Sequence, residues 1–203
     1  MTPRSYRSPA REAAAEETRQ RIMRAAKDLF ATDKPFSLEA VAKRARVTRV
    51  TIYHQFESKA QLLEAVFDEF AAAGGLSTEI PKLFGDPDPR RALRNMVHVF
   101  VSFYVNHRRM LPRLSAAIVD ADIAKAVQER SERRRAVLAA MIKRIVGPDV
   151  DPTRASDLVD LLFALTSYEM FELLSIRDRQ VPEIEALVVR AVDSVLEFSG
   201  LLA

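Results

Sequence analysis

The stretch that decides the fold is Ser37–Lys59, which reads SLEAVAKRARVTRVTIYHQFESK. Ser37 is placed to cap one short helix, and Thr48 is placed to cap another after a turn of about three residues. Two short helices joined in this way form a helix-turn-helix, whose second helix enters the DNA major groove. The small core between the two helices is expected to consist of Val41, Ala42, Ala45, Val47, Ile52 and Phe56.

The side chains of this segment fit the task of reading DNA. Arg49 can bind guanine bidentately, and methyl groups of Val50 and Thr51 can contact a thymine methyl. His54 lies on the same exposed side of the second helix. Hydroxyl, phenol and ammonium groups suited to phosphate contact are expected at Ser37, Thr48, Tyr53 and Lys59.

Outward from this segment, nearly the whole chain has helical periodicity, with no strand-like alternation. The pattern predicts an all-α protein of about nine helices in two modules, an N-terminal head and a C-terminal body. Residues 71–87, rich in Gly and Pro, are expected to connect the two parts without a helix. The body helices are expected over residues 88–108, 112–118, 120–146, 152–177 and 182–199.

The charge of the chain is concentrated in its first third. The net charge is only +3, but residues 1–65 hold 13 basic and 8 acidic residues, whereas the remainder holds 18 basic and 20 acidic ones. A basic module of +5 joined to a body of −2 is typical of nucleic-acid binding. We therefore expect a flexible basic arm over residues 1–12, a DNA-binding domain over 13–65, and a second helical domain over 66–203.

The motifs S-L-E-A-V-A-K-R-A at 37–45, V-T at 47–48, T-I-Y-H-Q-F at 51–56 and S-K-A-Q-L-L at 58–63 resemble the tetracycline-repressor (TetR) family of bacterial regulators. The resemblance covers about 45 residues and implies a homodimer in which each subunit has a three-helix DNA-binding head and a C-terminal helical body. The body, residues 66–203, is then an effector-binding and dimerisation domain. It implies DNA contacts at Thr48, Arg49, Val50, Thr51, Tyr53, His54 and Lys59. Arg46 departs from the pattern, because the family usually has Gly there. The turn is then strained or differently shaped, or Arg46 adds a phosphate contact; simple tolerance is the favoured interpretation.

Apolar and aromatic residues of the body form stripes that either fill the core or line a ligand cavity. Such a cavity would recognise an unknown small-molecule effector mainly by shape and apolar contact. The candidate pocket residues are Met96, Phe100, Phe103, Tyr104, Leu114, Met141, Phe163, Ser167, Met170 and Phe171. The charged run 128–135 is most simply a solvated helix face.

The last two expected helices are apolar on two sides, which indicates burial on two sides. One side would pack on its own body and the other on a second subunit, giving a four-helix bundle in a homodimer. The alternative is a core within one chain. The candidate interface residues are Leu158, Leu161, Leu162, Leu165, Ile184, Leu187, Val188, Ala191, Val192 and Val195.

Several classes of function lack the residues that they need. The chain has no Cys and only three scattered His, and it has no Gly-rich phosphate loop or nucleophile motif, so we expect no enzyme, no metal and no cofactor. No apolar run reaches the length of a membrane span, and we expect a cytoplasmic protein. The leading hypothesis is a ligand-responsive transcriptional regulator that acts as a repressor on a pseudo-palindromic operator in double-stranded DNA. The alternative is a nonspecific DNA-binding or protein-interaction module without an effector.

Overall fold

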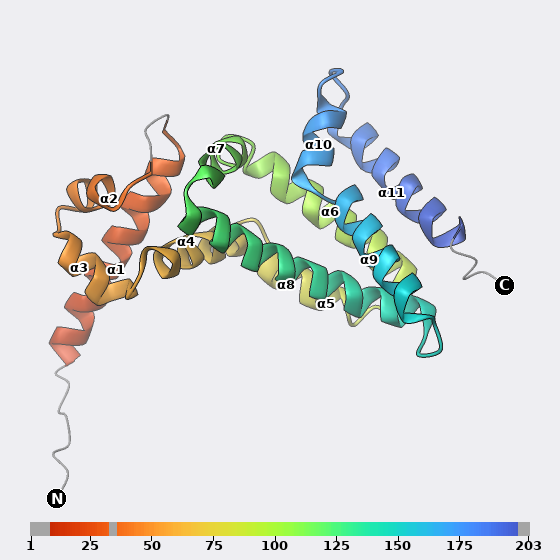
Figure 1. The fold of residues 1–203 in the computed structure, drawn as a ribbon, viewed down its shortest axis with the longest axis horizontal. Coiled ribbons are helices and arrows are strands. Elements are labelled where there is room, and N and C mark those ends of the chain that lie inside the picture. Colours follow the sequence, from red (N-terminus) through yellow and green to blue (C-terminus); the bar gives the residue numbers. More distant parts are fainter. Residues whose placement is uncertain (1–8, 33–35, 199–203) are drawn as a thin grey trace, which may run out of the picture. The chain divides into compact units, whose positions relative to one another are not determined.

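The computed structural model describes residues 9–32 and 36–198, and within them it contains eleven α-helices, one 3-10 helix and no strand (Figure 1). This confirms the expected all-α class, with a helix count close to the predicted nine. The first helix begins at Pro9, so residues 9–12 of the expected arm are helical. The rest of that arm, residues 1–8, lies outside the described residues.

The N-terminal helices begin and end where the capping residues predict. Ser37 accepts a hydrogen bond from the backbone N–H of Ala40, and Thr48 accepts one from the N–H of Thr51. Each hydroxyl thereby satisfies one of the backbone donors that a helix start leaves free. The four helices are α1 (Pro9–Phe30), α2 (Leu38–Ala45), α3 (Arg49–Phe56) and α4 (Lys59–Ala73).

The later part of the chain differs from the sequence prediction in two places. Residues 71–87 are not a helix-free connection, because α5 forms there and carries Pro81 within it. The helix expected over 152–177 is broken at Thr166–Ser167, where the Ser167 hydroxyl caps a separate helix. The remaining elements are α5 (Leu76–Leu83), α6 (Pro89–Asn106), α7 (Leu111–Ala116), η1 (Ala117–Val119), α8 (Ala121–Val146), α9 (Pro152–Leu165), α10 (Tyr168–Ser175) and α11 (Val181–Phe198).

Backbone contacts divide the chain into two compact units. The first, here called the head unit, combines Met1–Glu69 with Pro112–Ala126, and the second, the body unit, combines Phe70–Leu111 with Val127–Ala203. The segment containing most of α7, η1 and the start of α8 therefore groups with the N-terminal helices.

The head unit has a small apolar core formed by α1, α2 and α3, which pack on one another (Figure 1). Five of the six residues expected between α2 and α3 are buried, and Val47 is half-buried. Ile22, Ala26 and Phe30 of α1 are buried on the same core. This packing holds α3 rigidly, since its two buried residues, Ile52 and Phe56, are only 1% and 2% exposed.

The body unit is built on α6, which packs against α5, α10 and α11, while α11 also packs against α9. Asp88 caps α6 through the N–H groups of Arg90 and Arg91, and Pro89 occupies its first turn. The buried face of α6 consists of Ala92, Leu93, Met96, Val97, Phe100, Val101 and Tyr104. The predicted apolar stripe of this helix is therefore the core of the body unit.

Candidate DNA interface and body cluster

The turn between α2 and α3 has the geometry that the family pattern requires, although Arg46 replaces Gly. Arg46 has φ 55° and ψ 47°, in the left-handed region. Its N–H donates to Lys43 O, and the N–H of Val47 donates to Ala42 O at 3.0 Å, which together form a Schellman motif. A non-Gly residue in this conformation costs about 1–2 kcal/mol. The turn is therefore strained but not reshaped.

Helix α3 presents a polar and partly apolar outer face, because its only buried side chains are Ile52 and Phe56. Val50 is 63% exposed and Tyr53 is 43% exposed, values that are high for side chains of this size. His54 is also exposed, and Thr51 is half-buried. The residues expected on base edges are thus available on one accessible helix.

Arg49, at the start of this outer face, is paired with a carboxylate. Its guanidinium donates to Glu39 of α2 at 2.5 Å, and both side chains are more than half exposed. Tyr53 and then Glu39 raise the pKa of Arg49. Exposed ion pairs of this kind contribute only about 0–1 kcal/mol, so the pair exchanges readily for a DNA acceptor.

Lys59, which begins α4, is held more firmly. Its Nζ donates to Asp120 Oδ2 and lies 3.7 Å from Asp122 Oδ2, and its side chain is only 16% exposed. The other oxygen of Asp120 accepts the N–H groups of Asp122 and Ile123 at the start of α8. The hydrogen bond from Lys59 lowers the pKa of Asp120. Lys59 and Asp120 are 61 residues apart in the sequence, and no sequence pattern predicts their contact.

The hydroxyl groups expected at phosphates already have local structural roles. The Oγ atoms of Ser37 and Thr48 cap α2 and α3, and Thr48 Oγ1 also lies 2.9 Å from Thr51 Oγ1. A hydroxyl that accepts one hydrogen bond still has its own hydrogen to donate. Capping therefore leaves both residues able to donate to a phosphate oxygen.

In the body unit, the structure places Arg134 of α8 among the predicted pocket residues. Its NH1 group donates to Tyr104 Oη at 2.9 Å and to Thr166 O at 2.7 Å, and its NH2 group donates to Phe163 O at 3.0 Å. The guanidinium lies 3.9 Å from the centroid of the Phe163 ring. A cation at the two carbonyls that end α9 is favourable for the helix dipole.

Arg134 corrects the interpretation of 128–135 as a solvated face. The Arg135 side chain is also partly buried, since it pairs with Asp160 and lies over the Phe163 ring. The sequence does indicate that Arg134 faces the core, because this residue precedes the buried Leu138 and Met141 by four and seven residues. That spacing places it on the apolar face of α8.

Tyr104 is the centre of the aromatic cluster in the body unit. Its hydroxyl donates to Thr166 O at 2.6 Å, and its ring lies 5.7 Å from that of Tyr168 and 5.8 Å from that of Phe171. Burial raises the pKa of Tyr104, and burial with nearby Glu172 raises that of Tyr168 to about 12. Both phenols therefore stay neutral and keep a hydrogen to donate near pH 7.

The other predicted pocket residues divide between full and partial burial. Met96 and Phe100 of α6 and Met141 of α8 are buried, whereas Phe103, Phe163, Ser167, Met170 and Phe171 are half-buried. The Ser167 hydroxyl accepts the N–H of Met170 as a helix cap. Leu114 lies on α7 and groups with the head unit, unlike the rest of the set. Shared placement in one pocket remains a prediction for these residues.

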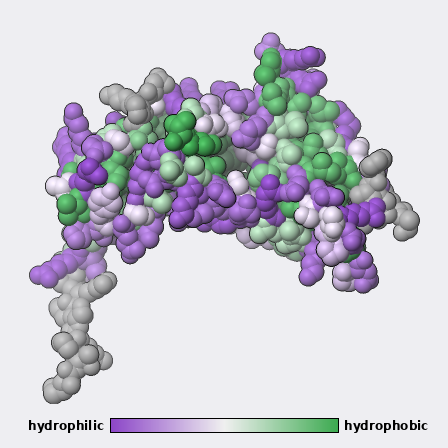
Figure 2. Space-filling view, viewed as in Figure 1, coloured by the Kyte–Doolittle hydropathy of each residue, from purple (hydrophilic) through white to green (hydrophobic). Residues whose placement is uncertain are grey.

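The ten residues predicted at a dimer interface face two ways. Leu158, Leu162, Ile184, Val188 and Val192 are at most 4% exposed within one chain, so they belong to its own core. Leu161 is 50% exposed, and the remaining four, Leu165, Leu187, Ala191 and Val195, are half-buried. Figure 2 shows hydrophobic surface over α10 and α11, where Leu173, Ile176 and Val181 are also exposed.

A metal-binding cluster and a membrane-spanning helix are both absent from the described residues. Within residues 9–32 and 36–198, no three His, Asp or Glu side chains come together in an arrangement suited to a metal ion. None of the helices in that part of the chain has the length and apolar content needed to cross a membrane.

The all-helical fold contains a helix-turn-helix, and a comparison with known families finds a match over that part of the chain. Residues 22–66 match the family model described as "Bacterial regulatory proteins, tetR family". The matched segment includes α2 and α3 and spans 45 of the 203 residues of the chain. Among curated proteins, none is similar enough to the chain to count as a match.

Solved structures of the same fold cover almost the whole chain. A structure described as a TetR-family transcriptional regulator from Syntrophomonas wolfei has a TM-score of 0.68 at 16% identity, covering 93% of this chain and 97% of its own. A TetR-like regulator from Rhodococcus sp. RHA1 has a TM-score of 0.60 at 20% identity, covering 97% and 99%. NalD of Pseudomonas aeruginosa, titled the secondary repressor of the MexAB-OprM multidrug efflux pump, has a TM-score of 0.61 at 21% identity, covering 92% and 96%. These identities establish the fold of the body as well as the head.

Proposed function

We propose that this DNA-binding regulator is a homodimeric repressor that acts in the cytoplasm on a pseudo-palindromic operator and is released by a small effector. The observation that carries the proposal is the outer face of α3, where Val50 and Tyr53 are exposed beside Arg49 while Ile52 and Phe56 anchor the helix. A rigid helix with an exposed face of this composition suits direct reading of the major groove. Phosphate contacts from Ser37, Arg46, Thr48 and Lys59 would fix its register.

Dimerisation would place two α3 helices in successive major grooves, about 34–36 Å apart. The accessible side of α9 and α11 supports this part of the proposal, because Leu161 is exposed and Leu165, Leu187, Ala191 and Val195 are only half-buried within one chain. An exposed apolar surface of this kind favours association with a second copy. The five buried residues of the original set would support that surface from behind.

A test of the dimer replaces Leu161 by Lys and measures the molar mass in solution. Lys at a 50% exposed position should be tolerated by the monomer but should oppose burial against a partner. The matched control is Val119→Lys, which introduces the same charge at a 96% exposed residue of η1. We expect a monomeric L161K and a dimeric V119K. A dimeric L161K would show that this side of α9 is not the interface.

The effector would bind in the body unit against the aromatic cluster around Tyr104. The surrounding rings and the half-buried Met170 favour a largely apolar compound, because aromatic and Met side chains adapt to such surfaces. An effector acts only by binding one of two conformations more tightly. A repressor role is consistent with that of the structurally similar NalD, which is described as the secondary repressor of a multidrug efflux pump.

Selection of bound sequences from a random DNA pool tests the operator part directly. We expect one enriched palindromic sequence, bound about 10³-fold or more tightly than scrambled DNA. Affinity for all sequences within a factor of about two would instead identify a nonspecific DNA-binding module. Repeating the selection with candidate apolar compounds would detect the effector as a loss of enrichment.

A further inference from the structure

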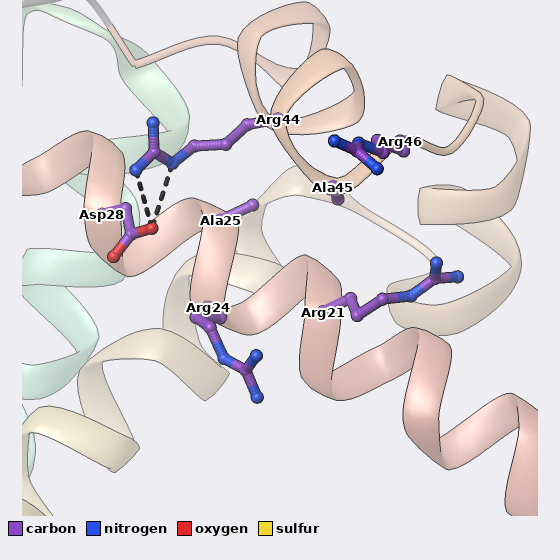
Figure 3. A pocket seen from close by; sticks show the side chains of 7 residues that line it. All are labelled: Arg21, Arg24, Ala25, Asp28, Arg44, Ala45 and Arg46. Carbon is purple, nitrogen blue, oxygen red and sulfur yellow. Dashed lines mark hydrogen bonds and ion pairs between the residues drawn. The ribbon is translucent and has the colours of Figure 1, made fainter.

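A hollow of about 380 Å³ opens on the surface of the head unit between α1 and α2 (Figure 3). Its floor contains Ala25 and Ala45, which are 4% and 5% exposed, and their small side chains leave the space above them open. Arginines of both helices and of the following turn surround this floor. The complete lining is Arg21, Arg24, Ala25, Asp28, Arg44, Ala45 and Arg46.

The positive charge of this hollow is largely uncompensated. The single carboxylate, Asp28, is occupied by Arg44, whose Nε and NH2 donate to Asp28 Oδ2 at 3.0 and 2.8 Å. Arg21 has only a 3.4 Å hydrogen bond to the Thr18 hydroxyl. Within residues 9–32 and 36–198, the guanidinium groups of Arg24 and Arg46 form no ion pair or hydrogen bond. Three guanidinium groups therefore surround one concave surface without an acidic partner.

We propose that this hollow is a phosphate-binding site, separate from the outer face of α3. Guanidinium groups bind phosphate oxygens in paired, charge-assisted hydrogen bonds, which is why Arg predominates at such sites. Figure 3 shows that the free guanidinium groups point in different directions around the two alanines and do not converge on a point. This arrangement suits a ligand with two or more phosphate groups better than a single ion.

The position of Arg46 adds an independent argument. Arg46 stands in the left-handed region, where Gly would avoid a cost of about 1–2 kcal/mol. Its guanidinium adds positive charge to a hollow that already holds Arg21 and Arg24. A strained residue that adds to an existing electrostatic cost is expected where it performs a function.

The phosphate groups have two possible sources, which share the same chemistry. One source is a pair of successive phosphodiesters in the DNA backbone, and this part rests on the proposed DNA-binding function. The other is a free compound that carries a diphosphate, and this part does not depend on DNA. The test therefore has one arm for each source.

The test variant is Arg24→Ala combined with Arg46→Ala in the full chain. The matched control is Arg154→Ala with Arg179→Ala, which removes two charges from exposed positions of the body unit. In the first arm, calorimetry measures pyrophosphate binding in the absence of DNA. In the second, the salt dependence of affinity for a fixed DNA duplex is measured. Circular dichroism verifies that each variant is folded.

We expect the R24A/R46A variant to lose about tenfold or more in pyrophosphate affinity, or to bind DNA with a salt slope smaller by about two per subunit. The control should change neither quantity. A change in either arm identifies the source of the phosphate groups. If R24A/R46A does not fold, the variant R24Q/R46Q, which removes both charges but keeps a polar side chain at each position, is measured in the same two arms.

Two results together would overturn the proposal: the wild type does not bind pyrophosphate, and the salt dependence of its DNA affinity has the same slope as that of the variant. That outcome would remove Arg46 from the proposed phosphate contacts but would leave the reading of bases by the outer face of α3 intact. If the wild type binds no DNA sequence specifically, that result would instead contradict the proposed function. Pyrophosphate binding would still test the hollow in that case.

Discussion

Nζ of Lys59, in the first turn of α4, donates to Oδ2 of Asp120, the residue that precedes α8. Arg49 is likewise paired with Glu39. Two cations proposed to contact DNA are therefore neutralised by carboxylates of the same unit when DNA is absent. The two pairs differ in exposure, because the Lys59 side chain is 16% exposed and that of Arg49 is 53% exposed. DNA must therefore replace a less exposed ion pair at Lys59 than at Arg49.

Replacing Asp120 by Asn should therefore strengthen DNA binding. Asn keeps an oxygen to accept the N–H groups at the start of α8 but no longer holds the ammonium of Lys59 by charge. Because a partly exposed pair contributes about 1 kcal/mol or less, we expect a twofold to fivefold gain in affinity at fixed salt. Fluorescence anisotropy with a labelled duplex measures the change. Unchanged affinity would show that Lys59 does not contact DNA.

The same variant should change how stability depends on pH. The lowered pKa of Asp120 means that its charged form stabilises the native state, and this contribution is complete above the ordinary carboxyl value near 3.8. It is lost as the pH falls through the lower native pKa. At pH 7 we expect D120N to unfold about 1 kcal/mol more easily than the wild type.

Urea unfolding at a series of pH values measures this difference. The difference between D120N and the wild type should decrease below pH 4, where the Asp120 carboxyl of the unfolded chain becomes protonated, and should be lost below the lowered native pKa. A difference that stays constant down to pH 2 would assign the effect of the mutation to packing and not to charge.

Replacing Arg46 by Gly should stabilise the head unit. Gly removes the left-handed strain, about 1–2 kcal/mol, but increases the entropy of the unfolded chain, which offsets about 0.4–1 kcal/mol. The expected net gain is about 0.5–1 kcal/mol in the free energy of unfolding. Arg46→Ala is the control, because Ala keeps the strain while losing the side chain. Equal stability of R46G and R46A would contradict the strain argument.

Tyr104→Phe should destabilise the body unit by about 1–2 kcal/mol. The lost hydroxyl donates to Thr166 O and accepts from Arg134, and removing it leaves buried polar groups with fewer partners. Tyr168→Phe is the matched control, since its hydroxyl bonds only the exposed Glu172 at 3.2 Å. We expect less than about 0.5 kcal/mol for Y168F in thermal unfolding. Similar losses for both variants would show that the Arg134 contacts are not coupled to Tyr104.

The sequence predicted most of the fold because its signals are local. Caps at Ser37, Thr48, Asp88 and Asp151 and the 3.6-residue periodicity determine where most helices begin and which side is buried. The break at Thr166 was missed because Ser167 is an N-cap within an otherwise continuous apolar pattern.

The sequence predicts the site residues only where they belong to a recognisable motif. The outer face of α3 follows from the spacing of Ile52 and Phe56, but the partners of Lys59 and Arg134 depend on tertiary contacts. Asp120 is distant in sequence from Lys59, and the carbonyl groups of Phe163 and Thr166 that bind Arg134 have no side-chain signature. Arg134 was assigned to solvent because its charge was given more weight than its position on the face of Leu138.

The central claim is that α3 reads a specific DNA sequence. The most direct measurement compares the affinity of wild type and of Arg49→Ala for the selected operator and for each single-base variant of it, at one fixed salt concentration. We predict that R49A loses about 1–3 kcal/mol of discrimination at one base step and keeps its preferences at the others. A uniform loss of affinity across all variants would assign Arg49 to the DNA backbone. A wild type that does not distinguish the operator from scrambled DNA would contradict the account.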